Sequence, residues 1–99
     1  MPAYIIVDVT IHNPEGYEDY KKLTPASLEN YEGKFIVRGG LAETLEGDWQ
    51  PGRMVVLDFP TAAQAKAWWS SPEYTPAKEL RQQNAMTKMI LVEGICPVQ

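Results

Sequence analysis

The first strand-like segment, residues 3–11, has two different faces. Its odd positions from Ile5 to Ile11 are all β-branched, whereas its even positions mix Tyr, Ile, Asp and Thr. Alternate side chains of a strand point to opposite faces of a sheet. One face of this strand is therefore suited to burial under helices, and the other is expected to lie in a less uniformly dry environment.

A helix is predicted to follow this strand. Asn13, Pro14 and Glu15 have the preferences of a cap, a first helical position and a first-turn charge, respectively. Aromatic and aliphatic side chains then recur at three- and four-residue spacing as far as residue 31. Because proline lacks an N–H and clashes in a straight helix, Pro25 predicts a kink or two short helices end to end.

The rest of the chain alternates in the same way. Residues 34–38 and 53–59 are predicted strands, joined by a connector of about a dozen residues, which is long for a hairpin. Thr61 and Gln64 form a capping box that starts a second helical region. Pro76 is expected to begin its second segment after a turn at 72–75, and residues 87–95 form the last predicted strand.

The resulting order, β-α-β-β-α-β, predicts one domain over residues 1–99 with an α+β, ferredoxin-like fold. Its four-stranded antiparallel sheet would have the first and third strands at the centre and both helices on one face. If no bulge intervenes, Ile6, Ile36, Met54 and Val56 lie on the other face. So apolar a face is expected to pack against a second copy of the chain, which predicts a homodimer.

Charge and composition exclude several classes of function. The chain has a net charge of −4 and scattered basic residues, so neither a nucleic-acid partner nor a membrane partner is expected. No leader or membrane-spanning run is visible, and a cytoplasmic location is the expectation. The only histidine is His12 and the only cysteine is Cys96, which argues against zinc, haem and other cofactors; Cys96 is interpreted as a passive thiol.

A candidate ligand site gathers at one end of the predicted sheet. Asp8 lies late in the first strand, Arg38 ends the second, and Arg53 opens the third. Arg38 would bind a carboxylate or enolate, and Asp8 would accept a proton or orient Arg38. Glu46 and Trp49 of the connector would roof the pocket. Gly39 and Gly40 would let a ligand approach the backbone.

The alternative interpretation of these charges is structural. Asp8 could form an ion pair with one arginine, or both arginines could be solvated. Strand parity also places Arg53 on the opposite face from Met54 unless a bulge redirects it.

Three groups of residues give the sequence a recognisable pattern. They are Phe35-Ile36-Val37-Arg38-Gly39-Gly40 with Leu45-Glu46-Gly47, then Arg53 to Pro60, then Ser71-Pro72-Glu73-Tyr74 with Val92-Glu93-Gly94. Together they resemble the family called domain of unknown function 1330, over nearly the whole chain. The resemblance implies a dimeric α+β barrel, in which two ferredoxin-like subunits pack sheet against sheet, and it adds Tyr74 to the ligand-binding candidates. Asp58 stands where the family more often has Glu, and Pro76 interrupts a stretch that is usually helical.

Two classes of function remain open. The resemblance implies relatives that include cofactor-free monooxygenases and isomerases, so one hypothesis is a cofactor-free enzyme acting on a small anionic, enolic or aromatic substrate. The other is a non-catalytic dimer that binds a small molecule or takes part in a stress response, because no nucleophile or metal site is recognisable.

Overall fold

The computed structural model describes residues 1–95, so Cys96 lies outside the described residues. A nine-residue strand opens the chain, and an α-helix, a 3₁₀ turn and two antiparallel strands follow before the second helical region and the last strand. The elements are β1 (Ala3–Ile11), α1 (Pro14–Leu28), the 3₁₀ turn (Glu29–Tyr31), β2 (Lys34–Gly40), β3 (Arg53–Phe59), α2 (Ala62–Trp69), α3 (Thr75–Asn84) and β4 (Ala85–Glu93).

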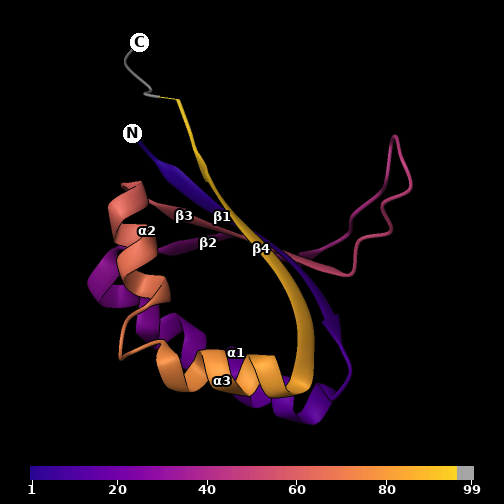
Figure 1. Ribbon diagram of the computed structural model, residues 1–99, viewed down its shortest axis with the longest axis horizontal. Coiled ribbons are helices and arrows are strands. Elements are labelled where there is room, and N and C mark those ends of the chain that lie inside the picture. The colour runs from indigo at the N-terminus through magenta and orange to yellow at the C-terminus, as the bar shows by residue number, and fades with distance from the viewer. Residues whose placement is uncertain (96–99) are drawn as a thin grey trace.

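The four strands form one antiparallel sheet in the order β2-β3-β1-β4. The helices lie on one face of this sheet, and within residues 1–95 its other face carries no helix (Figure 1). This arrangement confirms the predicted α+β, ferredoxin-like fold with β1 and β3 at the centre. The β-branched face of β1 is the helix-covered one, since Ile5, Val7 and Val9 are all buried.

Helix α1 runs from Pro14 to Leu28 without a break, with Pro25 in its last turns. The alternative of two short helices end to end is therefore wrong, and only a 3₁₀ turn follows the helix. Because Pro25 has no N–H, it leaves the carbonyl of Lys21, four residues earlier, without its helical donor. Arg38 on β2 supplies the missing donor, with its Nη2 at 3.0 Å from the Lys21 carbonyl oxygen.

The predicted starts of the second helical region are confirmed. The Thr61 hydroxyl accepts a hydrogen bond from the backbone N–H of Gln64 at 3.1 Å, as a capping residue does. Helix α3 begins at Thr75 with Pro76 in its first turn. Trp68 packs into the core, whereas its neighbour Trp69 is 44% exposed, because successive helical residues point in different directions.

The core beneath the sheet is aromatic. The ring centroids of Trp68 and Tyr74 are 3.9 Å apart, and Phe59 of β3 lies 5.6 Å from Trp68. The Trp68 indole donates to the Ser27 hydroxyl of α1 at 3.0 Å. This cluster fixes α1, α2 and the start of α3 against one another, and it supports the floor of the cavity described below.

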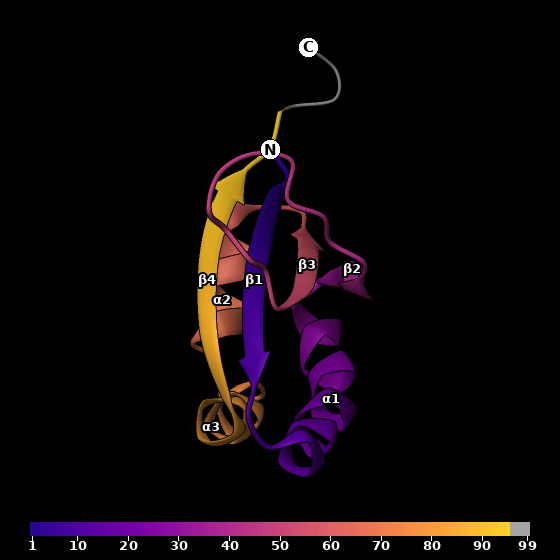
Figure 2. The same ribbon diagram turned by 90° about the vertical axis from the view of Figure 1, so that its right-hand side faces the viewer.

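The sheet face without helices, called here the open face, is turned toward the viewer in Figure 2. Register places on it the even-numbered residues of β1 together with their partners on β3 and β4, which are Met54, Val56, Met86, Lys88, Ile90 and Val92 among others. Met86 and Ile90 are 69% and 59% exposed. The predicted apolar character of this face is therefore confirmed, and β4 adds to it.

The pairing of β2 with β3 differs at Ile36 from the one that the unbulged alternation predicts. The pairing of β2 with β3 shifts between Phe35 and Val37, so Val37 and not Ile36 stands opposite Val56. This bulge also places Arg38 opposite Val55, on the helix-covered face. A second shift follows between Arg38 and Gly40, just before the connector, residues 41–52, called here the arm.

Candidate functional site

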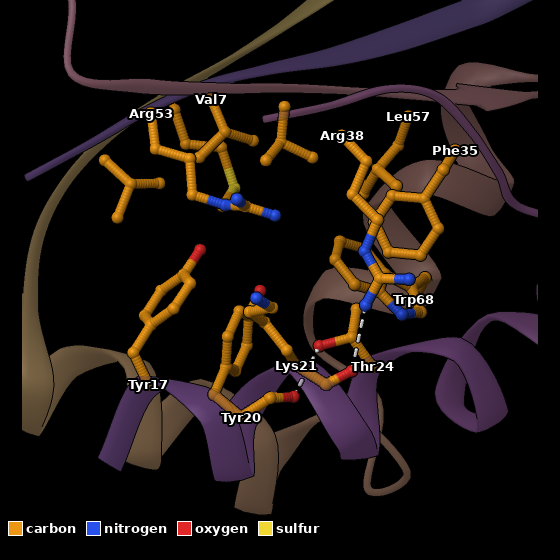
Figure 3. Close-up of a pocket in the computed structure, with 13 residues that line it drawn as sticks. Val7, Tyr17, Tyr20, Lys21, Thr24, Phe35, Arg38, Arg53, Leu57 and Trp68 are labelled. Atoms are coloured by element: carbon orange, nitrogen blue, oxygen red, sulfur yellow. Dashed lines mark hydrogen bonds between the residues drawn. The ribbon is translucent and has the colours of Figure 1, made fainter. Parts of the chain in front are cut away.

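A small cavity lies between α1 and the helix-covered face of the sheet (Figure 3). Its volume is about 20 Å³, which is room for roughly one water molecule. Most of its lining is aliphatic or aromatic, and its charged side chains are all basic. The lining residues are Val7, Val9, Tyr17, Tyr20, Lys21, Thr24, Phe35, Arg38, Arg53, Val55, Leu57, Trp68 and Met89.

Arg53 reaches the cavity from the first position of β3. Its guanidinium carbon lies 5.8 Å from the ring centroid of Tyr17 on α1. Gly39 makes room for this side chain: its φ is +75°, and a Cβ built there would fall 2.3 Å from an Arg53 Nη atom. Only glycine combines that backbone conformation with so close an approach.

Arg38 stands at the mouth of the cavity. It is the one exposed residue in the lining, and it crosses from β2 to the freed carbonyl of Lys21 on α1. On the way its guanidinium carbon lies 4.3 Å from the ring centroid of Phe35. Arg38 therefore has a backbone carbonyl and an aromatic ring as partners, and both leave most of its donors available.

Two polar atoms in this region are buried and have no hydrogen-bond partner among residues 1–95: Nε of Arg53 and Oγ1 of Thr87. Arg53 and Thr87 are the cross-strand neighbours of Val9 on either side, so their side chains share the helix-covered face. A buried donor without a partner costs about 1–3 kcal/mol, and native proteins usually satisfy it with water or a ligand.

The tyrosines beside the arginines stay protonated at neutral pH. Burial raises the pKa of Tyr17, although the nearby Arg53 lowers it in part. Burial raises the pKa of Tyr20 further, and the adjacent Tyr74 hydroxyl, 3.0 Å away, adds to that effect. Both phenols can therefore donate hydrogen bonds, and neither is a base near pH 7.

Asp8 does not join the arginines, which corrects the predicted three-residue site. It lies on the open face, opposite Met54 and Lys88, whereas Arg38 and Arg53 lie on the helix-covered face. Two physical reasons separate them. Strand alternation puts Arg53 across the sheet from Asp8, and the bulge in β2 moves Arg38 to the side of Arg53.

Asp8 instead holds the base of the arm. Its carboxylate accepts hydrogen bonds from Nε1 of Trp49 and from the backbone N–H of Gly52, each at 2.8 Å. These two bonds, the Trp49 bond foremost, hold the pKa of Asp8 below its ordinary value of 3.8. The Trp49 ring thus stands over the open face and lines a hollow there with Met54, Lys88 and other residues, so it does not roof the arginine cavity.

The remaining candidates lie at different depths. Glu46 is exposed on the arm, and Gly40 pairs with Met54 at the start of the arm; neither lines the arginine cavity. Tyr74 is fully buried behind Tyr20 and Trp68, and Nε of Arg81 donates to its hydroxyl at 3.3 Å. Gly39 is the glycine that shapes the cavity.

Tyr17, Tyr20 and Thr87 were not among the residues predicted for the ligand site. The signal for the tyrosines was present, because their helix must cover the strand face that carries Arg53. Thr87 gave no local signal, since its position beside Val9 depends on the pairing of β4 with β1.

Within residues 1–95, no three His, Cys, Asp or Glu side chains gather closely enough to hold a metal ion. No helix in that range is both long and apolar enough to cross a membrane.

Fold and cavity together define a ferredoxin-like α+β protein with a basic, aromatic cavity between its sheet and its first helix. The chain belongs to the family described as Domain of unknown function (DUF1330), whose model matches residues 2–95. No curated protein matches the chain.

Solved structures with the same fold include proteins of known and of unknown function. A protein of unknown function from Rhodopseudomonas palustris is 20% identical, with 97% of this chain and 84% of that chain covered and a TM-score of 0.76. A dimeric ferredoxin-like protein of unknown function from a Jannaschia species is 13% identical, with 95% and 100% covered and a TM-score of 0.73. SnoaB, a cofactor-independent oxygenase from Streptomyces nogalater, is 14% identical, with 98% and 96% covered and a TM-score of 0.68. At these identities the likeness extends to the fold alone.

Proposed function

We propose that the cavity between α1 and the sheet binds a small organic anion, a carboxylate or an enolate, through Arg53 and Arg38. The observation that carries this proposal is the buried Nε of Arg53, which has no hydrogen-bond partner among the described residues. The described residues that line the cavity include no carboxylate either. A guanidinium in such surroundings favours an anionic ligand with two oxygen atoms, which it binds through parallel hydrogen bonds.

The apolar walls of the cavity indicate which class of anion it would bind. Tyr17, Phe35 and Trp68 contribute aromatic surface, and their position favours a flat, partly apolar molecule over a small inorganic ion. The described cavity holds little more than one water molecule, so such a ligand enters when Arg38 leaves the Lys21 carbonyl. Arg38 is exposed and bonded there by its terminal nitrogen, and its side chain can move without disturbing the core.

Catalysis on an enolic substrate is the first form of this function. Two guanidinium groups in an apolar cavity favour the enolate over its neutral form, and the enolate is the reactive species in isomerisation without a cofactor: a proton that leaves one carbon returns at another. The cofactor-independent oxygenase among the proteins of the same fold supports the same view.

Binding without catalysis is the second form, and a specific observation favours it. Among residues 1–95, the cavity lining offers no carboxylate or histidine as a general base, and burial raises the pKa of Tyr17 and Tyr20. With Asp8 on the opposite face, the base that an enzyme of this kind needs would have to be solvent or the substrate itself.

A thermal-shift screen with small aromatic, enolic and dicarboxylic acids tests the binding proposal. At a hundred times its dissociation constant, a ligand adds about 2.7 kcal/mol to the free energy of unfolding. Arg53→Gln is expected to abolish the shift, and Lys22→Gln, an exposed position on α1, is the matched control. If no acid shifts the midpoint, or if Arg53→Gln responds like the control, the proposal is wrong.

The same ligands then separate the two forms of the function. An enzyme is expected to exchange the acidic C–H of a bound ligand with D₂O, or to consume O₂ in its presence, and to lose either activity in Arg53→Gln. A binding module is expected to do neither while keeping the thermal shift.

We also propose that the chain is a homodimer through its open face. Ile6, Met54, Val56, Ile90 and Val92 give this face its apolar character, and proteins of the same fold that are dimeric support the arrangement. Such an interface is expected to bury more than about 1,000 Å² in total. Sedimentation equilibrium at micromolar concentration tests it, and a monomer there would contradict it.

A further inference from the structure

The arm, residues 41–52, has no helix or strand. It stands away from the sheet on the side opposite the helices (Figures 1 and 2). Leu41 and Leu45 are fully or almost fully exposed on it, at 109% and 90%. A projecting segment with two exposed leucines is typical of a contact with another molecule.

The arm is also acidic. It carries Glu43, Glu46 and Asp48 and has no basic residue. Its base is nevertheless held firmly, because the Asp8 carboxylate accepts hydrogen bonds from Trp49 and Gly52, and the Thr44 hydroxyl donates to the Trp49 carbonyl. The projection is therefore built into the fold, so little conformational entropy remains to be lost when the arm binds.

A second unpartnered feature lies on the outer flank of β4. This strand is nine residues long and forms one edge of the sheet, paired within the described chain with β1 alone. Long apolar edge strands are usually covered in native proteins. Between β4 and α2 runs a groove of about 310 Å³, called here the flank groove, which is lined by Ile5, Ala65, Lys66, Trp69, Met89, Ile90 and Leu91.

The arm and the flank groove are complementary in character. The groove is apolar, with exposed Trp69 and Ile90 at its rim, and Lys66 is the one charged residue among the described residues that line it. The arm offers leucines to the apolar surface and carboxylates to Lys66. Arm and groove belong to different sides of one subunit, so the contact between them has to form between two copies.

We propose that the arm of each copy packs into the flank groove of a second copy, with Leu41 and Leu45 against Trp69 and Ile90 and with Glu43 and Glu46 facing Lys66. This inference rests on the proposed dimer through the open face. Packed sheets lie about 10 Å apart, and an extended run of six residues spans about 20 Å, so the arm can pass the partner's sheet edge. Two-fold symmetry makes the contact reciprocal, with two arms in two grooves.

Charge reversal tests the proposal. Lys66→Glu alone, or Glu43→Lys with Glu46→Lys, is expected to raise the dimer dissociation constant about tenfold, and the combined variant is expected to recover most of the affinity. Lys22→Glu on α1 makes the same charge change at an exposed position outside the contact and is expected to leave the dimer unchanged. Sedimentation equilibrium measures all four. If the combined variant recovers the dimer affinity, the proposed contact is supported. If it stays as weak as the single-sided variants, the proposed contact is wrong.

Site-specific cross-linking gives an independent measurement. In a Cys96→Ser background, one chain carries Leu45→Cys and a second chain, distinguished by size, carries Trp69→Cys. Mild oxidation of the mixture is expected to form a disulfide between the two chains of different size. When the second chain carries Leu23→Cys on α1 in place of Trp69→Cys, no such disulfide is expected. If the Leu23 and Trp69 chains react equally with Leu45→Cys, the proposed contact is wrong.

The outcomes distinguish this inference from the dimer itself. A wild-type protein that is a monomer would contradict both proposals. A wild-type dimer whose dissociation constant is unaffected by Leu41→Ser with Leu45→Ser would leave the dimer in place and overturn the role of the arm.

Discussion

The two faces of the sheet use their polar residues in opposite ways. On the helix-covered face, Arg53 and Thr87 bring buried polar atoms that have no partner among the described residues, beside a cavity with no acidic lining. On the open face, Asp8 is satisfied by two hydrogen bonds, and it is the hydrophobic side chains that lack cover. The first face thus has the properties of a ligand site, and the second has those of an interface.

The largest expected effect contrasts the packing of the two faces. Trp68→Ala is expected to lower the free energy of unfolding by about 3–5 kcal/mol, because Trp68 is fully buried and stacks on Tyr74. Ile90→Ala on the open face is expected to change the stability of the monomer by less than about 0.5 kcal/mol and to weaken the dimer instead. Urea titrations, together with sedimentation, measure both. A large loss of monomer stability in Ile90→Ala would show that the open face contributes to the core.

The adjacent residues Gly39 and Gly40 allow a closer comparison, because only Gly39 lies against the Arg53 side chain of the helix-covered face. Gly39→Ala is expected to destabilise by about 1–3 kcal/mol, since its φ is +75° and its Cβ would meet the Arg53 guanidinium. It should also weaken ligand binding by displacing Arg53. At Gly40 the nearest atom to an added Cβ is 3.8 Å away, so Gly40→Ala is the matched control. Denaturation measures the stability of both variants, and the thermal shift with ligand measures their binding. Equal stability and equal binding in the two variants would contradict the role of Gly39.

A smaller effect concerns Arg38 and Pro25. Arg38→Ala is expected to cost about 1 kcal/mol, because the side chain is exposed and its hydrogen-bond partner is the Lys21 carbonyl. In a Pro25→Ala background the helix supplies its own N–H to that carbonyl, so the cost of Arg38→Ala should fall. A double-mutant cycle measures this coupling. A loss of roughly 3–5 kcal/mol in Arg38→Ala alone would instead indicate a buried structural charge.

The smallest expected effect is the pH dependence of the anchor of the arm. Because hydrogen bonds lower the pKa of folded Asp8 below 3.8, ionised Asp8 stabilises the folded state above that pH, and this contribution is lost as the pH falls through the folded pKa. The difference in stability between wild type and Asp8→Asn should be constant above about pH 5 and shrink below the ordinary pKa. Urea titrations from neutral to acidic pH measure it, and a difference that grew on acidification would contradict the assignment.

Local sequence was sufficient for most of the fold. The cap at Thr61, the helix start at Pro76 and the alternation in residues 3–11 depend on neighbours within a few positions. Each of them predicted its element correctly. Residue spacing alone likewise predicted that Arg53 and Met54 lie on opposite faces of the sheet. The apolar character of the open face followed from the same alternation.

Only the tertiary structure decided which charged residues share a site. The bulge between Phe35 and Val37 exists through the pairing of β2 with β3, and it moves Arg38 from the face of Asp8 to the face of Arg53. The partner of Arg38 is equally non-local, since Pro25 frees a carbonyl on a helix that packs under β2. A one-residue shift in pairing reverses the face of every later side chain, and no local pattern encodes it.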